Sequence, residues 1–168
     1  MPDPFVDLAA VAPRSSDARG WLDVLYEGSH CVLKRSFSSR GVFRGLHLQL
    51  APNRQTKLVR VVSGRILDFV VDPTVVDPEI HCTEIGPNRG WVLIPDHLAH
   101  GFYALEDTVF EYVCDGPYAE GHERGYSIAG LLSQEFGFDT PILSAKDAAA
   151  PPLQGRLVRH GVMPGRSL

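Results

Sequence analysis

The residues best suited to chemistry begin with a histidine in a strand-like run. Alternate side chains of a strand point the same way, so Phe43, Gly45, His47 and Gln49 should share one face of residues 42–50. Histidine titrates near neutral pH and can therefore take up or release a proton under ordinary conditions. The amide oxygen of Gln49 is a poor substitute for imidazole on a transition metal. The pattern favours proton transfer inside a polar lumen over metal chemistry.

A second histidine, His100, closes the stretch Pro95-Asp96-His97-Leu98-Ala99-His100. This spacing and the His47-Leu48-Gln49 run together resemble the cupin barrel, whose metal-binding members carry His-x-His in the first element. Here Gln49 takes the place of the second histidine, and residues 51–54 supply no glutamate. The resemblance implies a barrel whose metal site has been dismantled, so we expect neither a metal nor a cofactor.

Short runs of β-forming residues must position these histidines. Most of the chain between Trp21 and Asp115 alternates such runs with Gly, Pro and Asn turns, and no long amphipathic helix separates them. The expected strands are 21–27, 31–37, 42–50, 56–62, 65–72, 91–94, 101–105 and 109–114. Ser63-Gly64 predicts a tight hairpin. We predict an all-β, cupin-like jelly-roll barrel or sandwich, followed by a short helical or irregular C-terminal segment with one helix near residues 145–150.

Composition sets the broad class. A length of 168 residues, 44% of them hydrophobic, suits one domain spanning 1–168. A net charge of −4 argues against a nucleic-acid surface. The sequence shows no secretory signal and no apolar run near the roughly 20 residues that span a bilayer. Three unpaired cysteines suit reduced thiols, so we expect a cytoplasmic protein.

Several motifs in one order make a closer resemblance. The strings are Ser36-Phe37-Ser38, residues 41–49 (GVFRGLHLQ), residues 57–64 (KLVRVVSG), Ala99-His100-Gly101-Phe102, Tyr118 before Glu123-Arg124-Gly125, and Leu143-Ser144-Ala145-Lys146-Asp147. Together they resemble the dTDP-4-dehydrorhamnose 3,5-epimerase family over most of the chain. The resemblance implies a metal-independent epimerase that acts at C3, C5 or both of a nucleotide-linked 4-keto-6-deoxy sugar.

The same resemblance implies four catalytic residues. His47 matches the base that removes a proton beside the ketone, and Asp147 matches the carboxylate that orients its imidazole. Lys57 matches the cation that faces the developing oxyanion. Tyr118 matches the acid that returns a proton from the opposite face. Each also has a structural interpretation: His47 could be a structural strand histidine, Lys57 could be a solvated strand lysine, Tyr118 could pack in a turn, and Asp147 could cap a helix.

Further positions are expected to bind the substrate. Arg44 suits the diphosphate, because a guanidinium fork fits phosphate oxygens, whereas His100 could also be a core histidine. The complete expected set is Arg19, Trp21, Lys34, Arg44, Gln49, Arg60 and His100. Val32 and Lys34 stand where the family has a glutamine and an asparagine that face the substrate, which leaves the nucleotide and the sugar open.

Other functions and the assembly also remain to be decided. A nucleotide-sugar 3,4-ketoisomerase, a non-catalytic sugar-nucleotide-binding cupin and a metal-dependent oxygenase are alternatives on the same barrel. The apolar face of Leu46, Leu48 and Leu50 needs a cover. We therefore predict a homodimer through this face, with the arm near Trp21 crossing to the partner.

Overall fold

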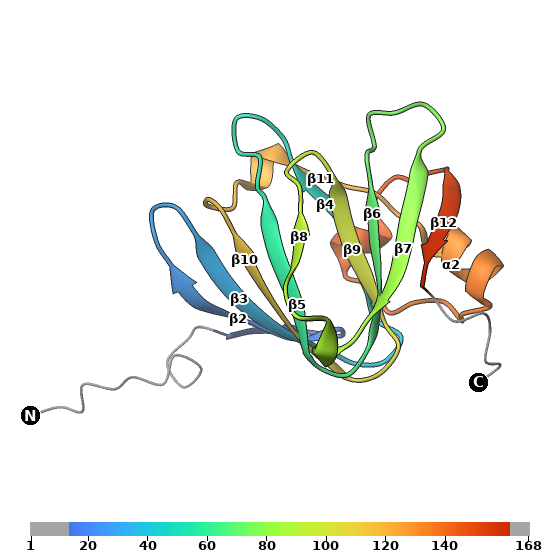
Figure 1. Ribbon diagram of the computed structural model, residues 1–168, viewed down its shortest axis with the longest axis horizontal. Coiled ribbons are helices and arrows are strands. Elements are labelled where there is room, and N and C mark those ends of the chain that lie inside the picture. The colour runs from blue at the N-terminus through green and yellow to red at the C-terminus, as the bar shows by residue number, and fades with distance from the viewer. Residues whose placement is uncertain (1–13, 162–168) are drawn as a thin grey trace, which may run out of the picture.

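Two six-stranded sheets pack face to face in the computed structural model, which describes residues 14–161 (Figure 1). The first sheet has the order β1-β2-β3-β10-β5-β8, formed by Arg14–Asp17, Gly20–Glu27, Val32–Ser38, Thr108–Cys114, Lys57–Ser63 and Val92–Ile94. The second has the order β11-β4-β9-β6-β7-β12, formed by Glu123–Gly125, Phe43–Gln49, Ala99–Ala104, Ile66–Val71, Glu79–Ile85 and Arg156–His160. The predicted all-β jelly-roll architecture is confirmed.

Short helices occupy the loops and the C-terminal segment. Two 3₁₀ turns span Pro87–Arg89 and Glu120–His122, and the α-helices α2 and α3 span Ala129–Phe136 and Ala145–Ala148. The helix predicted near residues 145–150 is therefore confirmed in position, whereas α2 was not predicted. No helix within residues 14–161 is long and apolar enough to cross a membrane.

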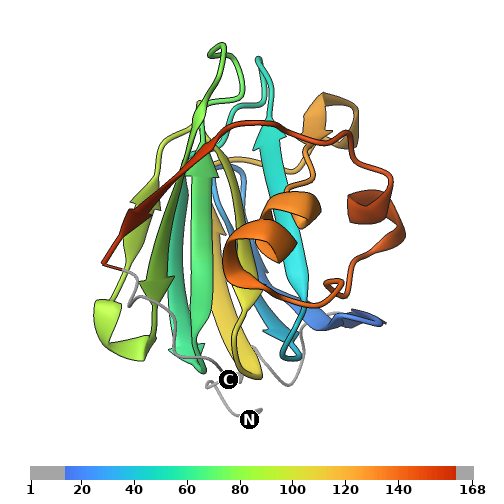
Figure 2. The same cartoon turned by 90° about the vertical axis from the view of Figure 1, so that its right-hand side faces the viewer.

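The molecule has two apolar layers. One lies between the sheets and includes Val59, Val61 and Phe110. The other lies on the outer side of the second sheet, where Leu132 of α2 packs into a cluster with Leu46 of β4. Figure 2 shows α2 lying across this outer side. The apolar face on which we based the predicted dimer interface is thus covered by the chain's own helix.

A β-bulge changes which side chains of β4 share a face. The register between β4 and β9 shifts between Arg44 and His47, so strict alternation fails there. Phe43 therefore joins Leu46 and Leu48 in the outer cluster, and was wrongly assigned to the face of His47. Arg44 takes its place and, like His47, faces the space between the sheets.

The turn predicted at Ser63-Gly64 is present but does not form a hairpin. It joins β5 of the first sheet to β6 of the second, and these two strands are not paired with each other. Gly64 has a φ of 83°, and a Cβ there would lie 2.4 Å from the Asp107 carbonyl oxygen. The glycine therefore allows the chain to change sheets in a crowded corner.

Candidate active site

A cavity of about 370 Å³ opens between the two sheets. Strands from both sheets line it, together with the loop that carries Tyr118 and the start of α3. Most of the side chains proposed from the sequence line it: Arg19, Lys34, Arg44, His47, Gln49, Lys57, His100, Tyr118 and Asp147. Residues far apart in the chain thus meet around one space large enough for part of a nucleotide sugar.

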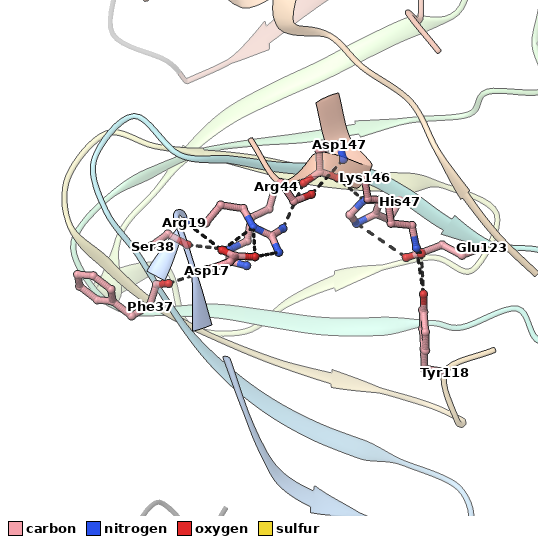
Figure 3. Close-up of polar contacts among 11 residues, drawn as sticks. Asp17, Arg19, Phe37, Ser38, Arg44, His47, Tyr118, Glu123, Lys146 and Asp147 are labelled. Atoms are coloured by element: carbon pink, nitrogen blue, oxygen red, sulfur yellow. Dashed lines mark hydrogen bonds and ion pairs between the residues drawn. The ribbon is translucent and has the colours of Figure 1, made fainter. Parts of the chain in front are cut away.

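The centre of the site is a histidine–carboxylate pair. His47 Nε2 lies 2.7 Å from Asp147 Oδ1. With Nε2 hydrogen-bonded to the carboxylate, the imidazole can present its other nitrogen, Nδ1, as a proton acceptor. Arg19 Nη1 lies 3.2 Å from the second oxygen of Asp147, and the same guanidinium pairs with Asp17. A line of polar contacts therefore runs from Asp17 to His47 (Figure 3).

Asp147 is held ionised by its neighbours. Burial alone would raise its pKa, but hydrogen bonds from His47 and Ser144 and the charge of Arg19 bring the pKa below its usual value. The alternative role as a helix cap is filled by Ser144, whose hydroxyl accepts from the backbone nitrogen of Asp147. The Asp147 carboxylate is thus left for the histidine.

Two cations border the cavity beside this pair. Lys57 Nζ lies 3.3 Å from the backbone oxygen of His47, and burial lowers the pKa of Lys57, an effect that the nearby Lys34 strengthens. Arg44 donates from Nε to Ser38 Oγ at 2.8 Å and from Nη2 to the Phe37 carbonyl oxygen at 2.9 Å. Arg44 of β4 is thus anchored to β3, and Lys57 of β5 to β4, so each side chain bridges the two sheets at the cavity wall.

Tyr118 belongs to a small polar cluster that also lines the cavity. Its hydroxyl donates to Glu123 Oε2 at 2.8 Å and lies 3.0 Å from Lys146 Nζ. Lys146 also pairs with Glu123, whose other oxygen lies 4.0 Å from His47 Nδ1. Burial, aided by the charge of Glu120, raises the pKa of Tyr118 above its usual value, which keeps the phenol protonated.

A second histidine–carboxylate pair forms part of the cavity wall. His100 Nε2 lies 2.7 Å from Asp68 Oδ1, and both side chains are almost completely buried. The His100 ring also stacks on Phe110, with a centroid separation of 6.3 Å. The sequence left open whether His100 is a core histidine or a residue of the site. In the structure it is buried and also lines the cavity.

Some buried polar atoms on the wall lack a protein partner. Gln49 and Ser36 both line the cavity and are at least nine-tenths buried. Within residues 14–161, the two side-chain amide atoms of Gln49 and the hydroxyl oxygen of Ser36 make no hydrogen bond. Buried polar groups normally have partners. These atoms are therefore available to a bound ligand, as the sequence suggested for Gln49.

Two predicted substrate-binding residues lie elsewhere. Strand alternation directs Arg60 to the outer side of the first sheet, where it pairs with Glu111 and lies over the Trp91 ring. Trp21 is also on that outer side, stacked on Phe37, while its neighbour Leu22 lines the cavity. Within residues 14–161, neither side chain lines the cavity, because each stands one position away from an inward-facing residue, and their contact with the substrate stays a prediction.

The structure also adds residues that sequence reasoning missed. Glu123 and Lys146 stand in motif strings that carried the resemblance, but we assigned no role to either. Gln55 fixes the Tyr118 loop by donating to the carbonyl oxygens of Gly116 and Pro117 at 2.7 and 2.8 Å. No sequence signal predicted the pairing of β11 with β4, which brings Glu123 to the site. Among the described residues, no group of three or more His, Cys, Asp or Glu side chains is arranged to hold a metal ion.

Comparison with known proteins gives a consistent result. The family model described as dTDP-4-dehydrorhamnose 3,5-epimerase matches residues 12–155. A dTDP-4-dehydrorhamnose 3,5-epimerase of Streptomyces griseus is 34% identical over 149 residues, which cover 83% of this chain and 72% of the relative. A dTDP-4-dehydrorhamnose 3-epimerase of Streptomyces niveus is 34% identical over 121 residues, covering 68% of this chain and 58% of the relative. The chain thus spans between about half and three quarters of these two relatives.

A solved structure agrees with these matches. The crystal structure of dTDP-4-dehydrorhamnose 3,5-epimerase from Bacillus anthracis, with TDP and PPi bound, has a TM-score of 0.64 and 30% identity. The match covers 84% of this chain and 91% of that one.

Proposed function

The chain belongs to the dTDP-4-dehydrorhamnose 3,5-epimerase family of carbohydrate epimerases, and we propose that it inverts C3, C5 or both of a nucleotide-linked 4-keto-6-deoxy sugar. The observation that carries this proposal is the arrangement of His47 with Asp147, Lys57 and Tyr118 around one cavity. These four residues supply a base, a cation and an acid, the groups needed to move protons beside a ketone.

The proposed reaction begins at His47. A proton on the carbon beside the ketone is weakly acidic, and His47 Nδ1 is the ring nitrogen free to accept it, because Nε2 is bound to Asp147. Asp147 then stabilises the imidazolium that forms. The negative charge moves to the ketone oxygen, where Lys57 is the proposed partner. The lowered pKa of Lys57 also makes it easier for this ammonium to share its proton with the oxyanion.

Inversion requires a proton on the opposite face of the sugar ring. Tyr118 is the proposed donor, and its raised pKa supports a protonated phenol at neutral pH. We assign Arg44, Arg19 and Lys34 to the phosphates and polar groups of the substrate, because each places positive charge on the cavity wall. Gln49 and His100 are the proposed hydrogen-bonding partners of the sugar.

Deuterium exchange tests this function directly. The protein is incubated in D₂O with several nucleotide 4-keto-6-deoxy sugars, and the label and configuration at C3 and C5 are measured by NMR and mass spectrometry. An epimerase incorporates solvent deuterium at an inverted carbon. A ketoisomerase would instead move the carbonyl to C3, and a non-catalytic binder would incorporate no label. The set of substrates also identifies the preferred nucleotide and the number of centres inverted.

We propose that the protein acts as a homodimer, although through a different surface from the one expected. Leu58, Val62, Trp91 and Leu93 are exposed on β5, β8 and the residue preceding β8. Leu58 is paired with Leu93 across the two strands, so these side chains can form one apolar patch. A second copy would cover the patch. Light scattering at micromolar concentration should give twice the monomer mass, and Leu93→Lys should shift it toward the monomer.

We further propose that the enzyme works in the cytoplasm. Cys31, Cys82 and Cys114 are free thiols in the structure, a state that a reducing compartment maintains. Fractionation of cells that produce the protein would test this assignment.

A further inference from the structure

The proposed acid, Tyr118, has a cation beside its reactive oxygen. Lys146 Nζ lies 3.0 Å from the Tyr118 hydroxyl, and the same ammonium pairs with Glu123. Glu123 in turn accepts a hydrogen bond from the Tyr118 hydroxyl at 2.8 Å. Figure 3 shows the Tyr118 hydroxyl, the Glu123 carboxylate and the Lys146 ammonium meeting at one point.

The backbone fixes two members of this cluster independently of Tyr118. Glu123 lies on β11, paired with Gln49 of β4, and only 11% of its side chain is exposed. Lys146 lies on α3, directly before Asp147. One helical turn therefore places a carboxylate at the proposed base and an ammonium at the proposed acid.

Proton donation changes the charge of Tyr118. As the phenol O–H bond breaks, its proton joins the sugar carbon, and the electron pair of the enolate forms the new C–H bond. The pair from the broken O–H bond stays on the phenol oxygen, which becomes a phenolate. An ammonium 3.0 Å away stabilises this anion, while it makes a weaker interaction with the neutral phenol. Lys146 therefore interacts more strongly after transfer than before it, which is the condition for lowering the barrier.

We propose that Lys146, held by Glu123, is a positioning residue that strengthens Tyr118 as the opposite-face acid. This inference rests on the proposed epimerase function and adds a residue to it. Glu123 keeps Lys146 at the phenol oxygen and accepts the hydrogen bond of the phenol until its proton is transferred to the sugar. Lys146 makes the phenol a stronger acid at the moment of transfer.

The test compares inversion with deuterium exchange in the same sample. Lys146→Met should lower inversion by about 10- to 100-fold and leave exchange on the His47 side within about twofold, because His47 can still remove and return a proton. Lys146→Arg should recover part of the inversion. Glu123→Gln should shift the ratio in the same direction by less, since Lys146 remains. Glu123 is not on α3, so this variant leaves the helix that carries Asp147 intact.

A double mutant shows whether Lys146 acts through Tyr118. Adding Lys146→Met to Tyr118→Phe should cause no further loss of inversion, because no phenolate then forms. Arg124→Met is the matched control: it removes a neighbouring cation that donates to the Glu123 backbone oxygen at 2.9 Å, and it should leave both rates unchanged.

The outcomes separate the two proposals. If the wild-type protein neither exchanges nor inverts any of the sugars, the epimerase function fails and the role of Lys146 fails with it. If the wild-type protein inverts a sugar but Lys146→Met lowers exchange and inversion equally, only the role of Lys146 is overturned. Additive losses in the double mutant would overturn it as well.

Discussion

Two histidine–carboxylate pairs stand in one barrel and have the same hydrogen-bond length. His47 with Asp147 and His100 with Asp68 both have an Nε2–Oδ1 distance of 2.7 Å. Both histidines line the same cavity, and they face each other in the register of β4 and β9. Distance alone therefore does not separate a proposed base from a wall residue.

The two pairs differ in access and in origin. The side chain of His47 is 26% exposed, whereas that of His100 is 7% exposed and stacked on Phe110. Asp68 lies on β6 beside β9 in the same sheet, while Asp147 comes from α3, 100 residues from His47. The more exposed imidazole is the one that can take up and release a proton, whereas the enclosed imidazole is suited to supporting the fold and contacting the sugar from the cavity wall.

The largest effect on catalysis should come from replacing His47, the more exposed of the two histidines. His47→Ala should reduce both exchange and inversion by about 10²–10⁴-fold, because no enolate forms without the base. The protein should stay folded, since Asp147 keeps its partner Arg19. Deuterium incorporation and circular dichroism measured together check this. A variant that still exchanges at the wild-type rate would remove His47 as the base.

Tyr118→Phe should lower the rate of inversion more than the rate of deuterium exchange, whereas His47→Ala should lower both. Inversion should fall by about 10²-fold, because the opposite-face donor is gone. Exchange should fall much less, since His47 can remove and return a proton on its own face. The ratio of label incorporated to product inverted, read by NMR, measures the separation. Equal losses would show that Tyr118 is not the only donor on that face.

His100→Ala should act mainly on stability. It leaves the Asp68 carboxylate buried without its partner, and breaking a buried pair typically costs about 3–5 kcal/mol of unfolding free energy. His97→Ala is the surface control and should change stability by less than about 0.5 kcal/mol. Urea denaturation of both variants provides the comparison. A stability loss of similar size in His47→Ala would show that the two pairs do not differ as we argue.

Asp147→Asn should lower the exchange rate less than His47→Ala does, and it should weaken the dependence of the unfolding free energy on pH. Loss of the carboxylate behind the imidazole should lower the exchange rate by roughly 10–100-fold. Because the folded pKa of Asp147 is depressed, the ionised group stabilises the fold above its unfolded pKa, near 3.8, and this contribution is lost as the pH falls through the folded value. The unfolding free energy of Asp147→Asn should therefore fall less steeply than that of the wild type below about pH 4. Parallel curves would contradict the pKa direction.

The sequence predicted most of the strands, but it assigned side chains to the wrong face where packing overrides alternation. The face of His47 was correct at Gln49 but wrong at Phe43, because the bulge in β4 depends on its pairing with β9. Helix α2 escaped prediction because Ile128 at its N-terminus provides no capping side chain and Gly130 weakens its first turn. Strand β7 did carry an alternating pattern, Glu79-Ile-His-Cys-Thr-Glu-Ile85, which we overlooked.

The site residues show the same contrast between what local sequence patterns reveal and what depends on the fold. Residues within recognisable strings, such as Lys57 and Tyr118, were found, and the pairing of Asp147 with His47 agreed with the expectation from the family. Arg60 and Trp21 lie outside the cavity lining, because one position along a strand reverses the face. Glu123 and Lys146 became visible only through contacts across distant segments.

The position of α3 late in the chain has a consequence for synthesis of the enzyme. A ribosome makes all of the β4, β9 and β10 strands well before residue 147, so much of the barrel can pair while the histidine still lacks its carboxylate. The helix is then followed by β12, which pairs in parallel with β7. The proposed active site is therefore completed only late in synthesis. A fragment that stops before α3 would contain His47, the proposed base, without the carboxylate that orients it.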